Sequence, residues 1–171
     1  MKKKKSAKQK TGTVFSILGT ILLILIILLC IPATVPKLMG YKVYTVITGS
    51  MEPAIPTGSL VLVHEKAPET IETDEVIAYY SSIDTGSIIT HRVVTNKTVS
   101  GEFITKGDAN AAEDMLPVSY DNVIGVVKLS VPYLGQIMSA LATNTGKVLA
   151  VCAIVAAILF HIVAGILKSE K

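Results

Sequence analysis

The sequence predicts a mainly β domain held between two transmembrane helices. Two long apolar stretches without charge lie toward the two ends of the 171-residue chain. The segments between them are short β-prone runs separated by turn residues. No helical apolar period of about 10 to 15 residues interrupts these runs, which disfavours a parallel α/β sheet. A chain of this length builds one compact domain, but hardly two.

The first apolar stretch covers residues 14–31, and six lysines without an acid precede it. At about 1.5 Å per residue, a helix of this length just crosses a hydrocarbon layer of about 30 Å. A cleavable secretory signal has the same order of parts, but its apolar region usually has about 7–15 residues. The residues that follow also lack a clean A-x-A site. We therefore expect a basic cytoplasmic tail over 1–13 and an uncleaved transmembrane helix over 14–35.

The second apolar stretch covers residues 148–167 and lies between two lysines. It predicts a transmembrane helix over 147–167 and a short cytoplasmic tail over 168–171. His161 lies inside this stretch, and an ionisable residue in a membrane span is a functional candidate. A neutral histidine near the end of the span, bonded to a backbone carbonyl or reaching the headgroups, is the interpretation we favour.

The distribution of lysines predicts the orientation in the membrane. Six lysines precede the first span and two follow the second, whereas only three lie near the spans on the intervening side. Because cytoplasmic flanks are enriched in Lys and Arg, both termini should be cytoplasmic. The β domain, residues 36–145, should then lie outside the cell membrane of a multi-pass protein.

Charge and cysteine content exclude several classes of function for the outer domain. Between residues 32 and 146, 12 acids outnumber seven Lys and Arg, so a nucleic-acid surface is not expected. The two cysteines, Cys30 and Cys152, both lie inside the spans. Neither suits a zinc site, a thiol nucleophile or a disulfide of the outer domain. We expect the lipid bilayer as a partner and no cofactor.

The outer domain contains six runs rich in β-branched and aromatic residues, bounded by Gly, Pro, Asp and Ser. Such runs are typical of an antiparallel sheet or a barrel-like fold. One further segment, 131–144, has the pattern of a short amphipathic helix that lies at the membrane and leads into the second span. The six predicted strands cover 41–48, 59–65, 74–81, 87–95, 101–107 and 121–129.

A constrained turn, "TGSMEP" at 48–53, presents a candidate nucleophile. Gly49 lets the backbone turn tightly before Ser50, and Pro53 restricts Glu52. Such a turn holds the Ser50 hydroxyl and N–H in fixed directions. A serine nucleophile also needs a base and donors for the oxyanion. On these six residues alone, an ordinary strand-to-loop turn is the better explanation of the segment.

The base must come from another part of the chain, and the outer domain has two histidines, His64 and His91. His91 lies in "ITHRVV", within a predicted strand. Alternation along a strand places Thr90 and Arg92 on the face opposite His91. We interpret His64 as a structural residue.

The segment "KGDANAAED" at 106–114 supplies candidate carboxylates, among them Asp108 and Asp114. One of them would orient the histidine and stabilise its cation. A turn-forming Asp or a solvated acidic loop is the simpler alternative. A metal site built from Asp108, Asp114 and His91 is also conceivable. It is disfavoured because no further ligand histidine or cysteine is close, so no metal is predicted.

Three segments in this order, "TGSMEPAIPTGSLVLV", "THRVV" and "KGDANAAED", resemble the type I signal peptidases. They resemble in particular the branch found in the endoplasmic reticulum, in archaea and in some Gram-positive bacteria. That branch has a histidine where the purely bacterial branch has a lysine base. The resemblance covers roughly residues 10–135. It implies that the outer domain is catalytic and adopts an antiparallel signal-peptidase-like β-fold.

The resemblance also implies roles for individual residues. Ser50 would attack the scissile carbonyl, and His91 would be the general base. Asp114 matches the orienting acid, and Asp108 matches a second Asp that some members require. The Ser50 N–H and the Thr48 hydroxyl would stabilise the oxyanion, although a threonine fixes its rotamer more stiffly than the usual serine. Which of the two acids orients the histidine stays open.

The function implied is removal of N-terminal signal peptides from secreted preproteins at the outer face of the membrane. Substrates would carry small residues at the last and third-last signal positions. One rival is a non-catalytic membrane β-module or adaptor, in which Ser50, His91 and Asp114 would lie far apart. Another rival is a membrane-tethered serine endopeptidase that trims other substrates.

Overall fold

The computed structural model describes residues 7–82 and 86–169. The two predicted cytoplasmic tails lie partly outside these residues. The chain forms two compact units, one of residues 1–34 and 140–171 and the other of residues 35–139. We describe each unit separately.

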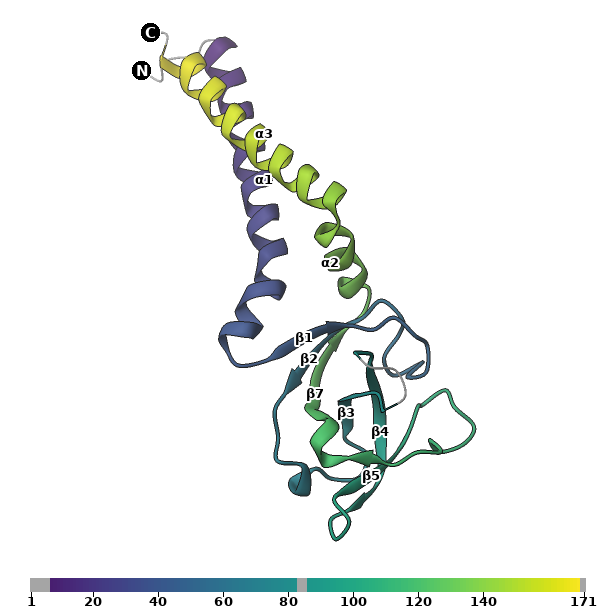
Figure 1. The fold of residues 1–171 in the computed structure, drawn as a ribbon. Helices are drawn as coiled ribbons and strands as arrows, with labels where there is room; N and C mark the ends of the chain where they lie inside the picture. Colours follow the sequence, from purple (N-terminus) through teal and green to yellow (C-terminus); the bar gives the residue numbers. More distant parts are fainter. Residues whose placement is uncertain (1–6, 83–85, 170–171) are drawn as a thin grey trace. The chain divides into compact units, whose positions relative to one another are not determined.

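The first unit contains most of helix α1 (Ala7–Leu38) and all of helix α3 (Asn144–Ser169) (Figure 1). Both helices are long and apolar enough to cross a membrane. Helix α1 is longer than the predicted span and continues through Pro32 and Pro36. Prolines are tolerated in membrane helices because neighbouring groups satisfy the freed carbonyls.

Small residues bring the N-terminal part of α1 close to the C-terminal part of α3 within the first unit, and the two helices diverge from there (Figure 1). Gly12 and Gly19 are buried in α1. A Cβ atom added to Gly19 would lie 3.0 Å from the His161 ring, so this histidine packs on the glycine backbone. The rings of Phe15 and Phe160 lie 5.7 Å apart. Glycines of this kind permit close helix packing in lipid.

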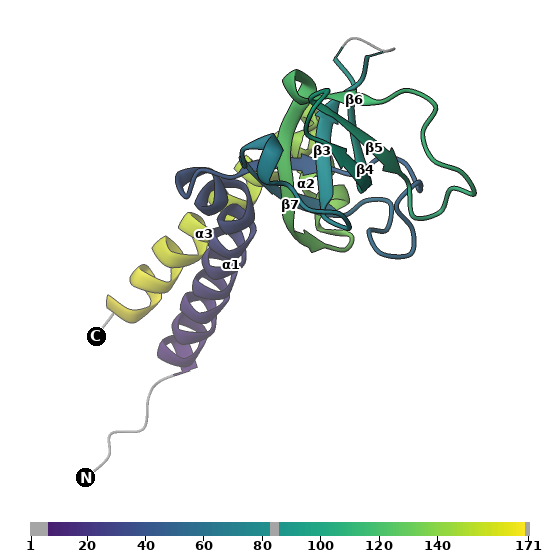
Figure 2. The ribbon, with the colours of Figure 1, turned by 90° about the horizontal axis from the view of Figure 1, so that it is seen from below.

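The second unit is built on one seven-stranded antiparallel sheet in the order β1-β2-β7-β3-β4-β5-β6. Figures 1 and 2 show the sheet curling on itself from two directions. The mainly β fold with two apolar terminal helices is therefore confirmed. The strands are β1 (Lys42–Thr45), β2 (Leu60–His64), β3 (Val76–Tyr80), β4 (Ile88–Lys97), β5 (Glu102–Lys106), β6 (Val118–Ser119) and β7 (Val123–Val131).

Each of the six runs predicted from the sequence overlaps one strand. Strand β6 was not predicted, because two residues give no alternation to read; it forms by pairing Val118 with Phe103 of β5. Helix α2 (Leu134–Ala142) confirms the helix expected within 131–144. Two short 3₁₀ turns, at Pro68–Thr70 and Tyr120–Asn122, complete the elements.

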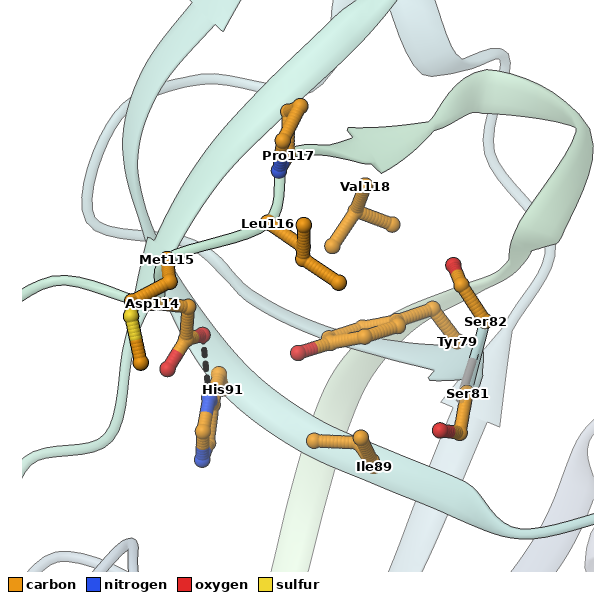
Figure 3. Close-up of a pocket in the computed structure, with 10 residues that line it drawn as sticks. All are labelled: Tyr79, Ser81, Ser82, Ile89, His91, Asp114, Met115, Leu116, Pro117 and Val118. Carbon is orange, nitrogen blue, oxygen red and sulfur yellow. Dashed lines mark hydrogen bonds and ion pairs between the residues drawn. The ribbon is translucent and has the colours of Figure 1, made fainter. Parts of the chain in front are cut away.

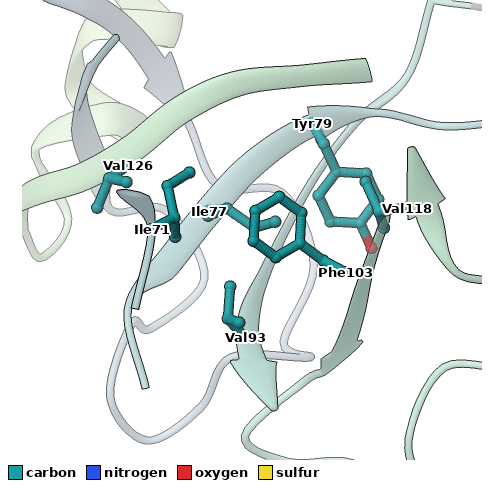
Figure 4. Close-up of a cluster of buried hydrophobic side chains, with 7 residues drawn as sticks. All are labelled: Ile71, Ile77, Tyr79, Val93, Phe103, Val118 and Val126. Carbon is teal, nitrogen blue, oxygen red and sulfur yellow. The ribbon is translucent and has the colours of Figure 1, made fainter. Parts of the chain in front are cut away.

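Two buried clusters lie on opposite faces of the sheet and fix which strand residues face the site. On β3, Tyr79 belongs to the first cluster and Ala78 to the second, as strand alternation requires. On β4, Val93 faces the first cluster. His91 must share that face, whereas Arg92 points to the other. Figure 4 draws the first cluster: Ile71, Ile77, Tyr79, Val93, Phe103, Val118 and Val126.

Candidate active site

Ser50 lies in an irregular segment after β1, and its neighbours fix its backbone. Met51 is 1% exposed and packs in the second buried cluster, which anchors the segment. The carbonyl oxygen of Ser50 accepts a hydrogen bond from the Ala109 N–H at 2.9 Å. A Cβ atom on Gly107 would lie 2.6 Å from that oxygen, so only glycine permits this approach. The serine is therefore held against the start of the 107–113 loop.

Glu52 braces the turn that carries Ser50. Its Oε1 accepts from the backbone N–H of Thr57 at 3.2 Å and from the Thr57 hydroxyl at 2.9 Å. These bonds lower the pKa of Glu52. The Glu52 N–H donates to the carbonyl of Gly49 at 3.0 Å, and the Glu52–Pro53 peptide is cis. The expectation of a tight turn at this serine is thus met.

His91 is buried on β4, with 8% of its surface exposed. Its Nδ1 lies 2.6 Å from Oδ2 of Asp114, as Figure 3 shows. Neutral histidine can donate from Nδ1 to this carboxylate only if Nε2 is left without a proton. The pair therefore favours the tautomer in which Nε2 is free to accept one.

Thr105 on β5 holds Asp114 at two points. Its hydroxyl donates to Oδ2 of Asp114 at 2.6 Å, and its carbonyl accepts from the Asp114 N–H at 2.8 Å. Thr105 has no exposed surface (0%). Thr105 was not predicted from the sequence as a site residue. The available signal was a polar side chain at an inward position, two residues after the buried Phe103 on the same strand.

Tyr79 completes the surroundings of the pair. Its hydroxyl lies 3.5 Å from Oγ1 of Thr105, and its ring meets that of His91 edge-on at 6.4 Å. Burial raises the pKa of Tyr79 to about 12, and the nearby charge of Asp114 acts in the same direction. A cavity of about 240 Å³ opens beside these residues (Figure 3). Its further lining residues are Ser81, Ser82, Ile89, Met115, Leu116, Pro117 and Val118.

Asp108 has a different partner. Nε and Nη2 of Arg92 donate to its two carboxylate oxygens at 2.8 and 2.6 Å, and Nη1 of Arg92 donates to the carbonyl of Asp74 at 2.8 Å. These bonds to the Asp108 carboxylate raise the pKa of Arg92. The structure thus separates Asp108 from the pair formed by His91 and Asp114. Within residues 7–82 and 86–169, no three His, Cys, Asp or Glu side chains gather as a metal site.

Gly107, the residue that follows β5, lies next to both Ser50 and His91. The pairing of Arg92 with Lys106 places Gly107 next to His91, one step beyond the ladder. Gly107 also contacts the carbonyl of Ser50, as described above. The Thr48 hydroxyl lies 3.5 Å from the Ser50 hydroxyl.

A groove of about 440 Å³ runs past Ser50. One wall is the segment 44–48 and the other is the segment 86–90, which precedes His91.

His64 is placed elsewhere: its ring packs against Tyr41 at 5.0 Å, in keeping with a structural role.

Two known proteins are similar to part of this chain. Signal peptidase I W of Bacillus subtilis (strain 168) is 42% identical over 92 residues, which are 52% of this chain and 47% of that protein. The signal peptidase complex catalytic subunit SEC11 of Yarrowia lipolytica (strain CLIB 122 / E 150) is 33% identical over 109 residues, which are 58% of this chain and 62% of that protein. The chain thus spans between about half and three fifths of the length of these relatives. No family model matches the chain.

The names of both relatives agree with the resemblance that the three sequence segments implied. One relative is a bacterial signal peptidase I, and the other is the catalytic subunit of a eukaryotic signal peptidase complex. A chain similar to both fits the branch that these two kinds of enzyme share. By sequence, the chain is similar to the type I signal peptidases and resembles the branch of the endoplasmic reticulum and archaeal type.

Proposed function

We propose that the chain is a membrane-bound serine endopeptidase that removes N-terminal signal peptides from secreted preproteins. One observation carries this proposal: the 2.6 Å bond between Nδ1 of His91 and Oδ2 of Asp114, formed beside the loop that holds Ser50. An adaptor has no need for a buried histidine whose tautomer is fixed by a carboxylate.

In the first half of the reaction, Oγ of Ser50 attacks the scissile carbonyl carbon while Nε2 of His91 takes its proton. The carboxylate of Asp114 stabilises the imidazolium that forms. The Ser50 N–H and the Thr48 hydroxyl donate to the oxyanion of the tetrahedral intermediate. His91 then gives the proton to the departing amine, which becomes the N-terminus of the mature protein.

In the second half, water attacks the acyl-enzyme ester. His91 accepts a proton from the water and returns it to Oγ of Ser50, and the signal peptide leaves with a new carboxylate. Asp108 takes no part in these proton transfers. We assign it the task of fixing the 107–113 loop through its two bonds to Arg92.

The groove beside Ser50 suits an extended substrate. Strand β1, at one end of the sheet order, pairs on one side with β2 and continues into the groove wall. An extended peptide presents alternate side chains on one face, so the last and third-last signal residues would point the same way. A groove against main-chain segments favours small side chains at both positions.

The two apolar helices and the homologues support attachment to a membrane. We further propose that both helices span the cell membrane. The N-terminal end of α1 and the C-terminal end of α3 would be cytoplasmic, so that the β domain is extracytoplasmic. A signal helix in the same bilayer would then present its cleavage site to Ser50 at high effective concentration. The partners are secretory preproteins and the lipid bilayer, and no nucleic acid.

The decisive experiment incubates the detergent-purified full chain with a preprotein and identifies the new N-terminus by mass spectrometry. We expect cleavage at the end of the signal peptide by wild type and none by Ser50→Ala. Ser100→Ala, which changes a serine in the β4–β5 turn, serves as the matched control and should cleave normally. Cleavage that persists in Ser50→Ala would remove the proposed nucleophile.

The same assay separates the rivals. An adaptor would leave every preprotein intact, and an endopeptidase of another kind would cut unrelated peptides but spare authentic preproteins. A preprotein with a large aromatic residue at the last signal position should be cut poorly by the proposed enzyme.

A further inference from the structure

We propose that Thr105 is a positioning residue, whose hydroxyl holds the carboxylate of Asp114 in the orientation that His91 requires. The inference rests on the proposed function and adds a member to its machinery. It is drawn from the contacts of Thr105, which was not among the residues predicted from the sequence.

The geometry fixes Asp114 from one neighbour. Its N–H and its Oδ2 both bond to Thr105, at 2.8 and 2.6 Å. Oδ2 is also the oxygen that lies 2.6 Å from Nδ1 of His91. Two donors therefore converge on a single carboxylate oxygen. One of them is the hydroxyl of a rigid, β-branched residue with no exposed surface.

The bond from Thr105 restrains a carboxylate that the sheet itself does not hold in place. His91 and Thr105 lie on paired strands, but Asp114 follows the irregular loop 107–113. A carboxylate on such a segment can rotate about its Cβ–Cγ bond. A charge-assisted O–H···O⁻ bond of this length is about twice as strong as a neutral one and sets that rotation.

Thr105 should affect proton transfer by His91 as well as packing, because it orients the carboxylate that bonds His91. The charged and titratable groups that face His91 are Asp114 and the neutral Tyr79, while Arg92 and Asp108 pair with each other on the other face of the strand. Asp114 is then the sole charge that bonds His91 among the described residues. Whatever orients its carboxylate sets how well the imidazolium is stabilised.

A buried hydroxyl at a core position costs free energy unless it is hydrogen-bonded. The position next to Phe103 on the inward face would suit valine, which has nearly the same shape as threonine. If the hydroxyl mattered only for folding, valine would leave catalysis unchanged.

The test compares Thr105→Val with Thr105→Ser in the full chain. Valine keeps the backbone acceptor and removes only the hydroxyl. We expect kcat to fall about 10- to 100-fold, as for loss of a bond to a charged group, with KM within about twofold. Serine should restore most of kcat. Tyr120→Phe, which removes a hydroxyl bonded to Asn96 at the edge of the same core, is the matched control and should keep its activity.

A second measurement does not depend on activity. The Nδ1 proton of His91, bonded to a carboxylate, should give a low-field proton resonance that His91→Gln removes. We expect Thr105→Val to broaden or abolish this resonance and Thr105→Ser to retain it. If valine prevents folding, Thr105→Ala takes its place. A missing cleavage activity in wild type, together with the expected change in the resonance, would refute the proposed function and leave the positioning role standing. A folded variant without the hydroxyl that keeps both the wild-type resonance and the wild-type kcat would overturn the inference.

Discussion

Two neighbouring residues of β4 pair with two aspartates that close one loop, and the two pairs differ in what they can do. His91 bonds Asp114 on the buried face, where the histidine side chain is 10% exposed. Arg92 bonds Asp108 on the opposite face, where its side chain is 33% exposed. An arginine stays charged and cannot transfer a proton, whereas a histidine can. Of the two pairs, only the one on the buried face can therefore take part in proton transfer.

The largest expected effect comes from breaking the buried pair. Asp114→Asn removes the charge that stabilises the imidazolium and favours the wrong tautomer, so kcat should fall about 10³- to 10⁴-fold. His91→Ala should be at least as damaging, because members of such a unit are not additive. Rates of preprotein cleavage measure both, with circular dichroism to show that the variants fold. A fully active Asp114→Asn enzyme would show that another acid orients His91.

An intermediate effect, a loss of folding stability at alkaline pH, should come from Tyr79 on the buried face of the sheet. Burial raises the pKa of Tyr79 to about 12, against an unfolded value of about 10. The raised value means that the neutral phenol contributes stability in full below pH 10, and that this contribution is lost as the pH rises through 12. The full contribution amounts to about 3 kcal/mol.

The alkaline prediction is checked by urea unfolding of the detergent-purified chain at pH 8 and at pH 11.5. Tyr79→Phe should lose less stability between the two than wild type does. Tyr133→Phe, at an exposed tyrosine, is the matched control and should behave as wild type. Arg92 will not contribute in this range, because Asp108 raises its pKa further. Equal losses in Tyr79→Phe and wild type would place the alkaline transition elsewhere.

The smallest effect should come from breaking the outer pair. Asp108→Asn leaves the Arg92 side chain, which is 33% exposed, able to bond water, so the cost should be about 1 to 2 kcal/mol of unfolding free energy. Cleavage should decrease far less than in Asp114→Asn. In a double-mutant cycle with Arg92→Gln, the two changes should cost less than the sum of each alone, because they share one interaction. A loss of kcat as large as that of Asp114→Asn, without loss of stability, would give Asp108 a direct part in catalysis.

Much of the fold was predictable because its signals are local. The charge-free stretch at 14–31 and the alternation in "ITHRVV" each depend on a few adjacent residues, and they predicted a long apolar helix and the opposite facing of His91 and Arg92. Strand β6 was not predictable, because two residues become a strand only when β5 is there to pair with them. Helix α1 itself runs on to Leu38, beyond residue 35, where the first span is predicted to end.

By itself, the sequence determined the residue types available for chemistry: one constrained serine, two histidines and a loop with two candidate acids. It also supplied the order of segments that revealed the homology. Only the tertiary structure decided that Asp114 bonds His91 while Asp108 bonds Arg92, because the path of the 107–113 loop depends on contacts with Ser50 and Thr105. The role proposed for Thr105 also depends on the tertiary structure. Its hydroxyl can bond Asp114, nine residues later in the chain, only because the loop between them folds back toward β5.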